Sequence, residues 1–75
     1  MDKIEKVLAG VFQMRVENIV DDLSMDIVEK WDSLTHMKLI VALEETYNIE
    51  LTAEQIMSMT NVKTIKAIIY RKAAA

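Results

Sequence analysis

The scarcity of residues that interrupt helices constrains this chain more than any other feature of its sequence. The 75 residues include one glycine and no proline, which argues for helices over a turn-rich β fold. The chain has no cysteine and a single histidine, so disulfides and Cys- or His-based metal sites are excluded. A chain this short forms one domain and must fold by helix packing alone. We therefore expect a single all-α domain over residues 1–75.

The hydrophobic periodicity divides the chain into four expected helices. Three longer helices are predicted at residues 3–14, 33–47 and 61–72, and a short one at residues 53–58. A long connection over residues 15–31 carries spaced apolar side chains that would pin it to the helices, and a short extra turn is expected near residues 16–19. The expected capping residues are Asp2, Asp32, Thr52 with Gln55, and Thr60. Residues 73–75 are expected to be a frayed end or a cloning remnant. The pattern predicts a four-helix bundle.

The charges of the chain are unevenly distributed. Residues 17–50 contain nine acidic and two basic residues, whereas the net charge of the whole chain is −3. An acidic middle segment disfavours nucleic acid and favours basic protein partners. The charged first residues are not typical of a signal peptide, and no apolar run approaches the roughly 18 residues of a membrane span. We expect a cytoplasmic monomer without nucleic-acid binding or membrane insertion.

The strongest candidate site is the tripeptide Asp32-Ser33-Leu34 at the predicted start of the second helix. A serine in the first turn of a helix lies among unpaired backbone N–H groups at the positive end of the helix dipole. Both features stabilise a phosphate on the serine hydroxyl, and a flexible arm attached there would point into solvent. The tripeptide alone is also compatible with a plain helix start.

The longer pattern around the tripeptide is more specific. It consists of WDSL at residues 31–34, LIVALEETYNIEL at 39–51 and MTNV at 59–62, and it closely resembles the acyl carrier protein family. The resemblance implies that Ser33 receives 4′-phosphopantetheine from coenzyme A through a separate phosphopantetheinyl transferase. The thiol of this arm would carry an acyl group as a thioester, and the chain itself would not be an enzyme.

The resemblance also implies roles for residues around Ser33. Partner recognition is implied for Asp32, Leu34, Met37, Glu44, Glu45 and Glu50. The partners would be acyl-activating, acyl-transferring or synthase enzymes with basic docking patches. Trp31 and His36 are expected near the arm, with the indole at the rim and its N–H beside a polar partner or water. A hydrolase triad of Ser33, His36 and Asp32 is rejected, because residues three apart on one helix do not give the required geometry and no oxyanion-hole loop is recognisable.

Methionine is frequent, with six residues in the chain. Thioether side chains repack easily, so a methionine-rich interior would suit a bundle that admits an alkyl chain. An acyl cavity is predicted at Met25, Leu43, Ile56 and Met59, with ordinary core filling as the alternative.

Three departures from the family pattern bear on the pathway. Trp31 replaces the usual glycine, and Thr35 and Lys38 replace acidic residues on the second helix. They favour a specialised lipid, polyketide or cell-surface pathway over housekeeping fatty-acid synthesis. Two alternatives stay open: an aminoacyl or peptidyl carrier of the nonribosomal or D-alanyl type, and an unmodified helical interaction module.

Overall fold

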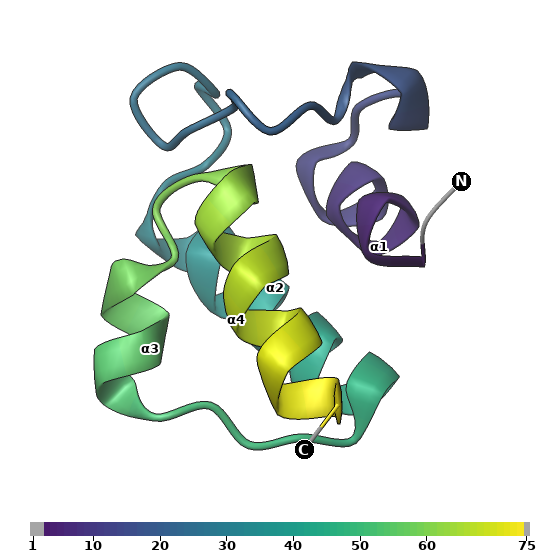
Figure 1. Ribbon diagram of the computed structural model, residues 1–75. Helices are drawn as coiled ribbons and strands as arrows, with labels where there is room; N and C mark the ends of the chain where they lie inside the picture. Colours follow the sequence, from purple (N-terminus) through teal and green to yellow (C-terminus); the bar gives the residue numbers. More distant parts are fainter. Residues whose placement is uncertain (1–2, 75) are drawn as a thin grey trace.

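The computed structural model describes residues 3–74, which form an all-α fold (Figure 1). The elements in chain order are α1 (Lys3–Phe12), the 3-10 turn η1 (Val16–Asn18), α2 (Ser33–Tyr47), α3 (Ala53–Ser58) and α4 (Val62–Ala74). The expected arrangement of three longer helices, one short helix and an extra turn is confirmed. Over the described residues, extended pairing is limited to an isolated bridge between Ser24 and Asn61.

Local hydrogen bonds fix the ends of the middle helices. At the start of α3, the Gln55 N–H donates to Thr52 Oγ1 at 3.1 Å and the Thr52 N–H donates to Gln55 Oε1 at 3.0 Å. This is the predicted reciprocal capping box. α2 ends at Tyr47, its C-cap Asn48 has a left-handed φ of 54°, and the Ile49 N–H donates back to Glu44 O at 3.1 Å.

The end of α1 differs from the prediction. The helix ends at Phe12 and not at residue 14, because Gln13 adopts a left-handed backbone with φ of 56°. The Met14 N–H then donates to Ala9 O at 3.0 Å, which closes the helix with a 6→1 bond. The expected N-cap Asp2 lies outside the described residues.

Both ends of α4 also differ from the prediction. Its cap is Asn61 and not Thr60, since Asn61 Oδ1 accepts a hydrogen bond from the Thr64 N–H at 2.7 Å. Ala73 and Ala74 belong to the last turn of α4, which extends past the predicted end at residue 72. Alanine has the highest helix propensity, which explains this extension. Residue 75 lies outside the described residues.

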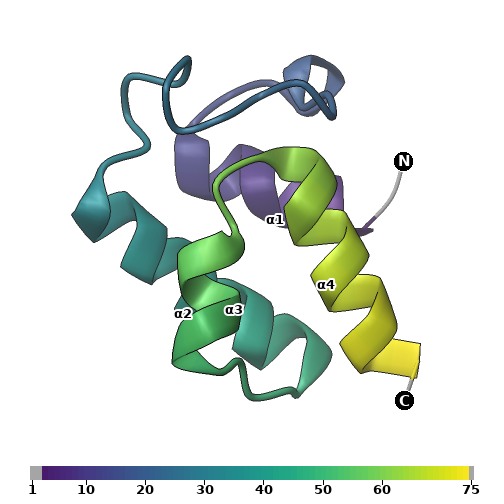
Figure 2. The same cartoon turned by 60° about the vertical axis from the view of Figure 1, so that its left-hand side comes forward.

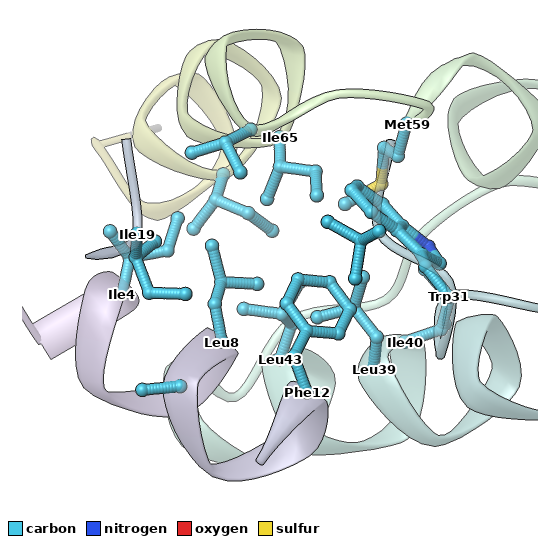
Figure 3. Close-up of a cluster of buried hydrophobic side chains, with 14 of the residues drawn as sticks. Ile4, Leu8, Phe12, Ile19, Trp31, Leu39, Ile40, Leu43, Met59 and Ile65 are labelled. Atoms are coloured by element: carbon cyan, nitrogen blue, oxygen red, sulfur yellow. The ribbon is translucent and has the colours of Figure 1, made fainter. Parts of the chain in front are cut away.

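The hydrophobic core lies where α1, α2 and α4 meet (Figure 3). Each helix contributes side chains that are buried at about one-turn spacing: Ile4, Leu8 and Phe12 from α1, Leu39, Ile40 and Leu43 from α2, and Val62, Ile65 and Ile69 from α4. Removing an apolar side chain of this size from water stabilises the fold by roughly 1.5–3 kcal/mol. This burial holds the helices together.

The connection between α1 and α2 arches over one end of the bundle in both views (Figures 1 and 2). Its apolar residues Ile19, Val28 and Trp31 are buried. Its backbone is joined to the start of α4, because the Met25 N–H donates to Thr60 O at 3.0 Å and the Val62 N–H donates to Leu23 O at 2.9 Å. The connection is therefore pinned to the bundle as predicted, and it delivers the chain in a fixed direction to the start of α2.

A charged node ties α4 to this connection and to α1. Lys66 Nζ lies 2.9 Å from Asp21 Oδ1 and 3.2 Å from Glu5 Oε2. The hydrogen bond to Asp21 raises the pKa of Lys66 above its ordinary value. Sequence reasoning missed this node, because its partners are 45 and 61 residues away along the chain.

Candidate functional site

Ser33 is the first residue of α2 and is exposed to solvent. The preceding residue, Asp32, is the N-cap, as predicted, and its Oδ1 accepts a hydrogen bond from the Thr35 N–H at 2.9 Å. The Asp32 carbonyl accepts from the His36 N–H at 2.8 Å, which is the first bond of the helix. The cap fixes the direction of the first turn, and the Ser33 side chain is left accessible at the positive end of the helix dipole.

The capping bond also stabilises the ionised form of Asp32. The hydrogen bond from the Thr35 N–H holds the pKa of the Asp32 carboxyl below its ordinary value. The site therefore presents an ionised carboxylate beside Ser33 at neutral pH.

Replacing Asp32 with alanine is expected to lower the melting temperature by several degrees at neutral pH and by much less in acid. Because the pKa is depressed in the folded state, the stabilisation is present above the unfolded-state pKa and is lost as pH falls through the folded-state pKa. Thermal unfolding followed by circular dichroism at about pH 7 and about pH 3 measures the difference. The exposed loop variant Asp26→Ala is the control. An equal loss for Asp32→Ala at both pH values would contradict this account.

Two consecutive hydrogen bonds link the connection before α2, the first turn of α2 and α3. The Trp31 indole Nε1–H donates to His36 Nδ1 at 3.0 Å, and His36 Nε2 lies 2.8 Å from Ile56 O on α3. The Trp31 ring is 2% exposed and its centroid lies 4.6 Å from that of Phe12. The expected polar partner of the indole is therefore present, but the expected rim position is wrong, because the ring is part of the core (Figure 3). His36 is partly exposed.

An apolar groove, called here the α2 groove, begins directly after Ser33. Its volume is about 430 Å³, and its lining is Leu34, Met37, Lys38, Val41, Ala42 and Glu45. Leu34, Met37 and Val41 are 66%, 53% and 49% exposed. Sequence reasoning predicted Leu34, Met37 and Glu45 here, but it missed Val41. The signal was present in the spacing of three and four residues from Leu34 to Val41.

The predicted acidic recognition residues do not share one environment. Glu45 and Glu50 are exposed. Glu44 is half-buried, and its Oε2 accepts a hydrogen bond from the Leu51 N–H at 2.9 Å. Its carboxylate therefore holds the turn between α2 and α3, which is a structural role that the sequence pattern did not reveal.

The residues predicted to form an acyl cavity lie in or against the core. Leu43 and Met59 are fully buried, and Met25 and Ile56 are partly buried. They line neither the α2 groove nor a second groove of about 330 Å³, formed by Phe12, Met14, Leu23, Ile27, Val28, Glu29 and Lys30. The cavity at these four positions stays a prediction.

Neither a metal-binding cluster nor a membrane-spanning helix is present in the part of the chain that the structure describes. No group of three or more His, Cys, Asp or Glu residues in residues 3–74 is arranged to hold a metal ion. None of the helices in this range is both long enough and apolar enough to cross a membrane.

Comparison with known proteins decides the family. The family described as "phosphopantetheine attachment site" matches residues 2–69. The acyl carrier protein of Buchnera aphidicola subsp. Baizongia pistaciae is 37% identical over 73 residues, covering 89% of this chain and 86% of the relative. This chain belongs to the acyl carrier protein family. The acyl carrier protein of Thermosynechococcus vestitus is 28% identical and covers 100% of this chain and 93% of the relative.

A solved structure also supports membership in the acyl carrier protein family. The solution structure of holo acyl carrier protein from Geobacter metallireducens superimposes with a TM-score of 0.84 at 28% identity, covering 95% of this chain and 82% of that chain. The chain is accordingly a carrier and not a catalyst, and its cofactor is covalently attached phosphopantetheine. The residues at the start of α2 fit such a group, because Ser33 is exposed and the capped helix end is favourable for a phosphate.

Proposed function

We propose that Ser33 is the attachment residue for 4′-phosphopantetheine and that the loaded arm carries an acyl group for biosynthetic enzymes. The observation that carries the proposal is the exposed serine at the first residue of α2. When bound, the arm supplies a thiol that forms a thioester with the cargo. The chain contributes the anchoring hydroxyl, the helix end that stabilises the phosphate, and the surface that enzymes recognise.

The direct experiment is incubation of the purified protein with coenzyme A, magnesium and a broad-specificity phosphopantetheinyl transferase. Mass spectrometry is expected to show the addition of one phosphopantetheinyl group, and peptide mapping is expected to place it on Ser33. A protein that stays unmodified, or one modified elsewhere, would overturn the proposal.

We further propose that this carrier serves a specialised lipid, polyketide or cell-surface pathway. The α2 groove supports it, because Lys38 lines the groove where family resemblance predicts an acidic residue. We expect the protein to act as a cytoplasmic monomer that visits a transferase and then acyl-activating, acyl-transferring or synthase enzymes. Asp32, Leu34, Met37, Glu45 and Glu50 are the proposed recognition residues, and Glu44 contributes through the turn that it holds.

Restoring the missing negative charges is expected to improve use by housekeeping enzymes. Lys38 would face the basic groups of such a partner, and like charges at an interface cost affinity and slow the steered encounter. The double variant Thr35→Asp with Lys38→Glu should raise the rate at which a housekeeping malonyl transferase uses the holo protein by about tenfold at low salt. The gain should shrink at high salt, because surface charges are screened.

A matched control separates local charge from net charge. Lys63→Glu with Ala67→Asp makes the same change in net charge on exposed positions of α4 and should change turnover little. Equal turnover of the parent and the Thr35→Asp, Lys38→Glu variant at low salt would contradict this argument. A role in housekeeping fatty-acid synthesis would then have to be considered again.

Loading of an acyl chain is expected to raise the melting temperature. A cargo that contacts only the folded state stabilises it, and each buried CH₂ contributes up to about 0.8 kcal/mol. The measurement compares holo protein with forms that carry acyl chains of increasing length. A melting temperature that does not depend on chain length would show that the cargo stays in solvent and would contradict the predicted cavity at Met25, Leu43, Ile56 and Met59.

A further inference from the structure

The two hydrogen bonds from Trp31 to His36 and from His36 to Ile56 join three parts of the fold close in sequence or space to the start of α2. Trp31 belongs to the connection before α2, His36 lies in the first turn of α2, and Ile56 lies in α3. Ser33 stands between the first two along the chain. These two hydrogen bonds are therefore positioned to hold the connection and α3 in place relative to the proposed attachment residue.

The chemistry of the three groups fixes which atom donates and which accepts in each hydrogen bond. An indole N–H can only donate a hydrogen bond, so His36 Nδ1, 3.0 Å away, must be the unprotonated acceptor. In a neutral imidazole the other nitrogen then carries the hydrogen, and Nε2–H donates to the Ile56 carbonyl at 2.8 Å. This geometry corresponds to an imidazole that carries its hydrogen on Nε2 and uses both ring nitrogens in hydrogen bonds.

The hydrogen bond between His36 and the Ile56 carbonyl matters because α3 depends on contacts with the rest of the fold. It has six residues and contributes no fully buried side chain to the core. A helix of that length is not stable by itself and depends on tertiary contacts. The Ile56 carbonyl is one of the last four in α3, which lack partners within the helix, and it is approached by the Met59 N–H at 3.3 Å and by His36. His36 therefore caps the C-terminal end of α3 from a neighbouring helix.

We propose that His36 is a positioning residue, which holds the Trp31 indole and α3 in fixed places around Ser33 so that partner enzymes meet a preorganised attachment site. The proposal rests on the proposed function of Ser33. An enzyme that acts on Ser33 approaches the flanking surfaces as well. If the connection and α3 were loose, their ordering would oppose binding, and KM for the carrier would rise while kcat stayed unchanged.

Two variants of His36 test the proposal. His36→Gln retains one acceptor and one donor at the end of the side chain, whereas His36→Leu keeps apolar bulk and loses both. With a phosphopantetheinyl transferase, His36→Leu is expected to raise KM for the apo protein about three- to tenfold with little change in kcat, as follows from the loss of one or two hydrogen bonds. His36→Gln should recover most of this loss. Amide hydrogen exchange in α3 should accelerate by a similar factor in His36→Leu and return toward the parent rate in His36→Gln.

A spectroscopic measurement on the parent protein needs no variant. The ¹⁵N chemical shifts of His36 should report an Nε2–H tautomer, and the indole Nε1–H resonance of Trp31 should show the shift of a hydrogen-bonded group. An Nδ1–H tautomer would overturn the proposal. So would equal KM values and equal α3 exchange rates for the parent, His36→Gln and His36→Leu. If the parent itself is not modified by the transferase, the proposed function fails, whereas the tautomer and exchange measurements still decide the role of His36.

Discussion

Replacing Ser33 with alanine is expected to abolish modification by a phosphopantetheinyl transferase and to leave the fold intact. The hydroxyl is the proposed point of attachment, so the loss should be complete. The fold should survive because Asp32, and not Ser33, caps α2, and because alanine is well tolerated at the first position of a helix. Intact-mass spectrometry after incubation with coenzyme A measures the modification, and circular dichroism checks the helix content.

The matched control is Ser58→Ala. Ser58 is also an exposed serine, but it ends α3, and its hydroxyl donates to Glu54 O at 2.9 Å. A phosphate there would meet the negative end of the helix dipole, so this variant should be modified as fully as the parent. Modification of Ser33→Ala would contradict the assignment of the attachment residue.

Replacing Phe12 with alanine is expected to have the largest effect on stability. The Phe12 side chain is fully buried, and its ring packs against Trp31 with centroids 4.6 Å apart. Truncation of a buried phenylalanine to alanine costs about 3–5 kcal/mol, because it removes apolar contact and leaves a cavity. A core in a domain of this size supplies only about 3–5 kcal/mol, so we expect the variant to be largely unfolded at 25 °C.

Urea unfolding followed by circular dichroism measures the change in the free energy of unfolding. The control is Met57→Ala, because Met57 is a large apolar side chain that is 77% exposed. Its replacement should change stability by no more than about 0.5 kcal/mol. A Phe12→Ala protein that loses less than about 1 kcal/mol would show that the contact between α1 and Trp31 is not central to the core.

The sequence by itself determined the features that depend on residues close together in the chain. The apolar spacing of Ile4, Leu8 and Phe12 gave the buried face of α1. The N-cap at Asp32 and the capping box of Thr52 and Gln55 were predicted because their hydrogen bonds span three residues. The tripeptide Asp32-Ser33-Leu34, the proposed attachment site, was also recognisable from the sequence, because the cap, the serine and the start of the helix are adjacent in the chain.

The tertiary structure alone decided which partners meet across the fold. The Trp31 indole was expected at the rim where the arm would emerge, but it lies in the core because Phe12 and His36 offer it a ring contact and an acceptor. Glu44 was predicted as a recognition residue, and the structure adds a contact that the sequence did not reveal, because the turn after α2 brings the Leu51 N–H to its carboxylate. Sequence spacing reports periodicity within a helix, whereas these contacts depend on how helices and loops pack against each other over long separations. The sequence therefore pointed to Ser33 as the proposed attachment residue, and the packing determined the contacts of the residues on either side of it.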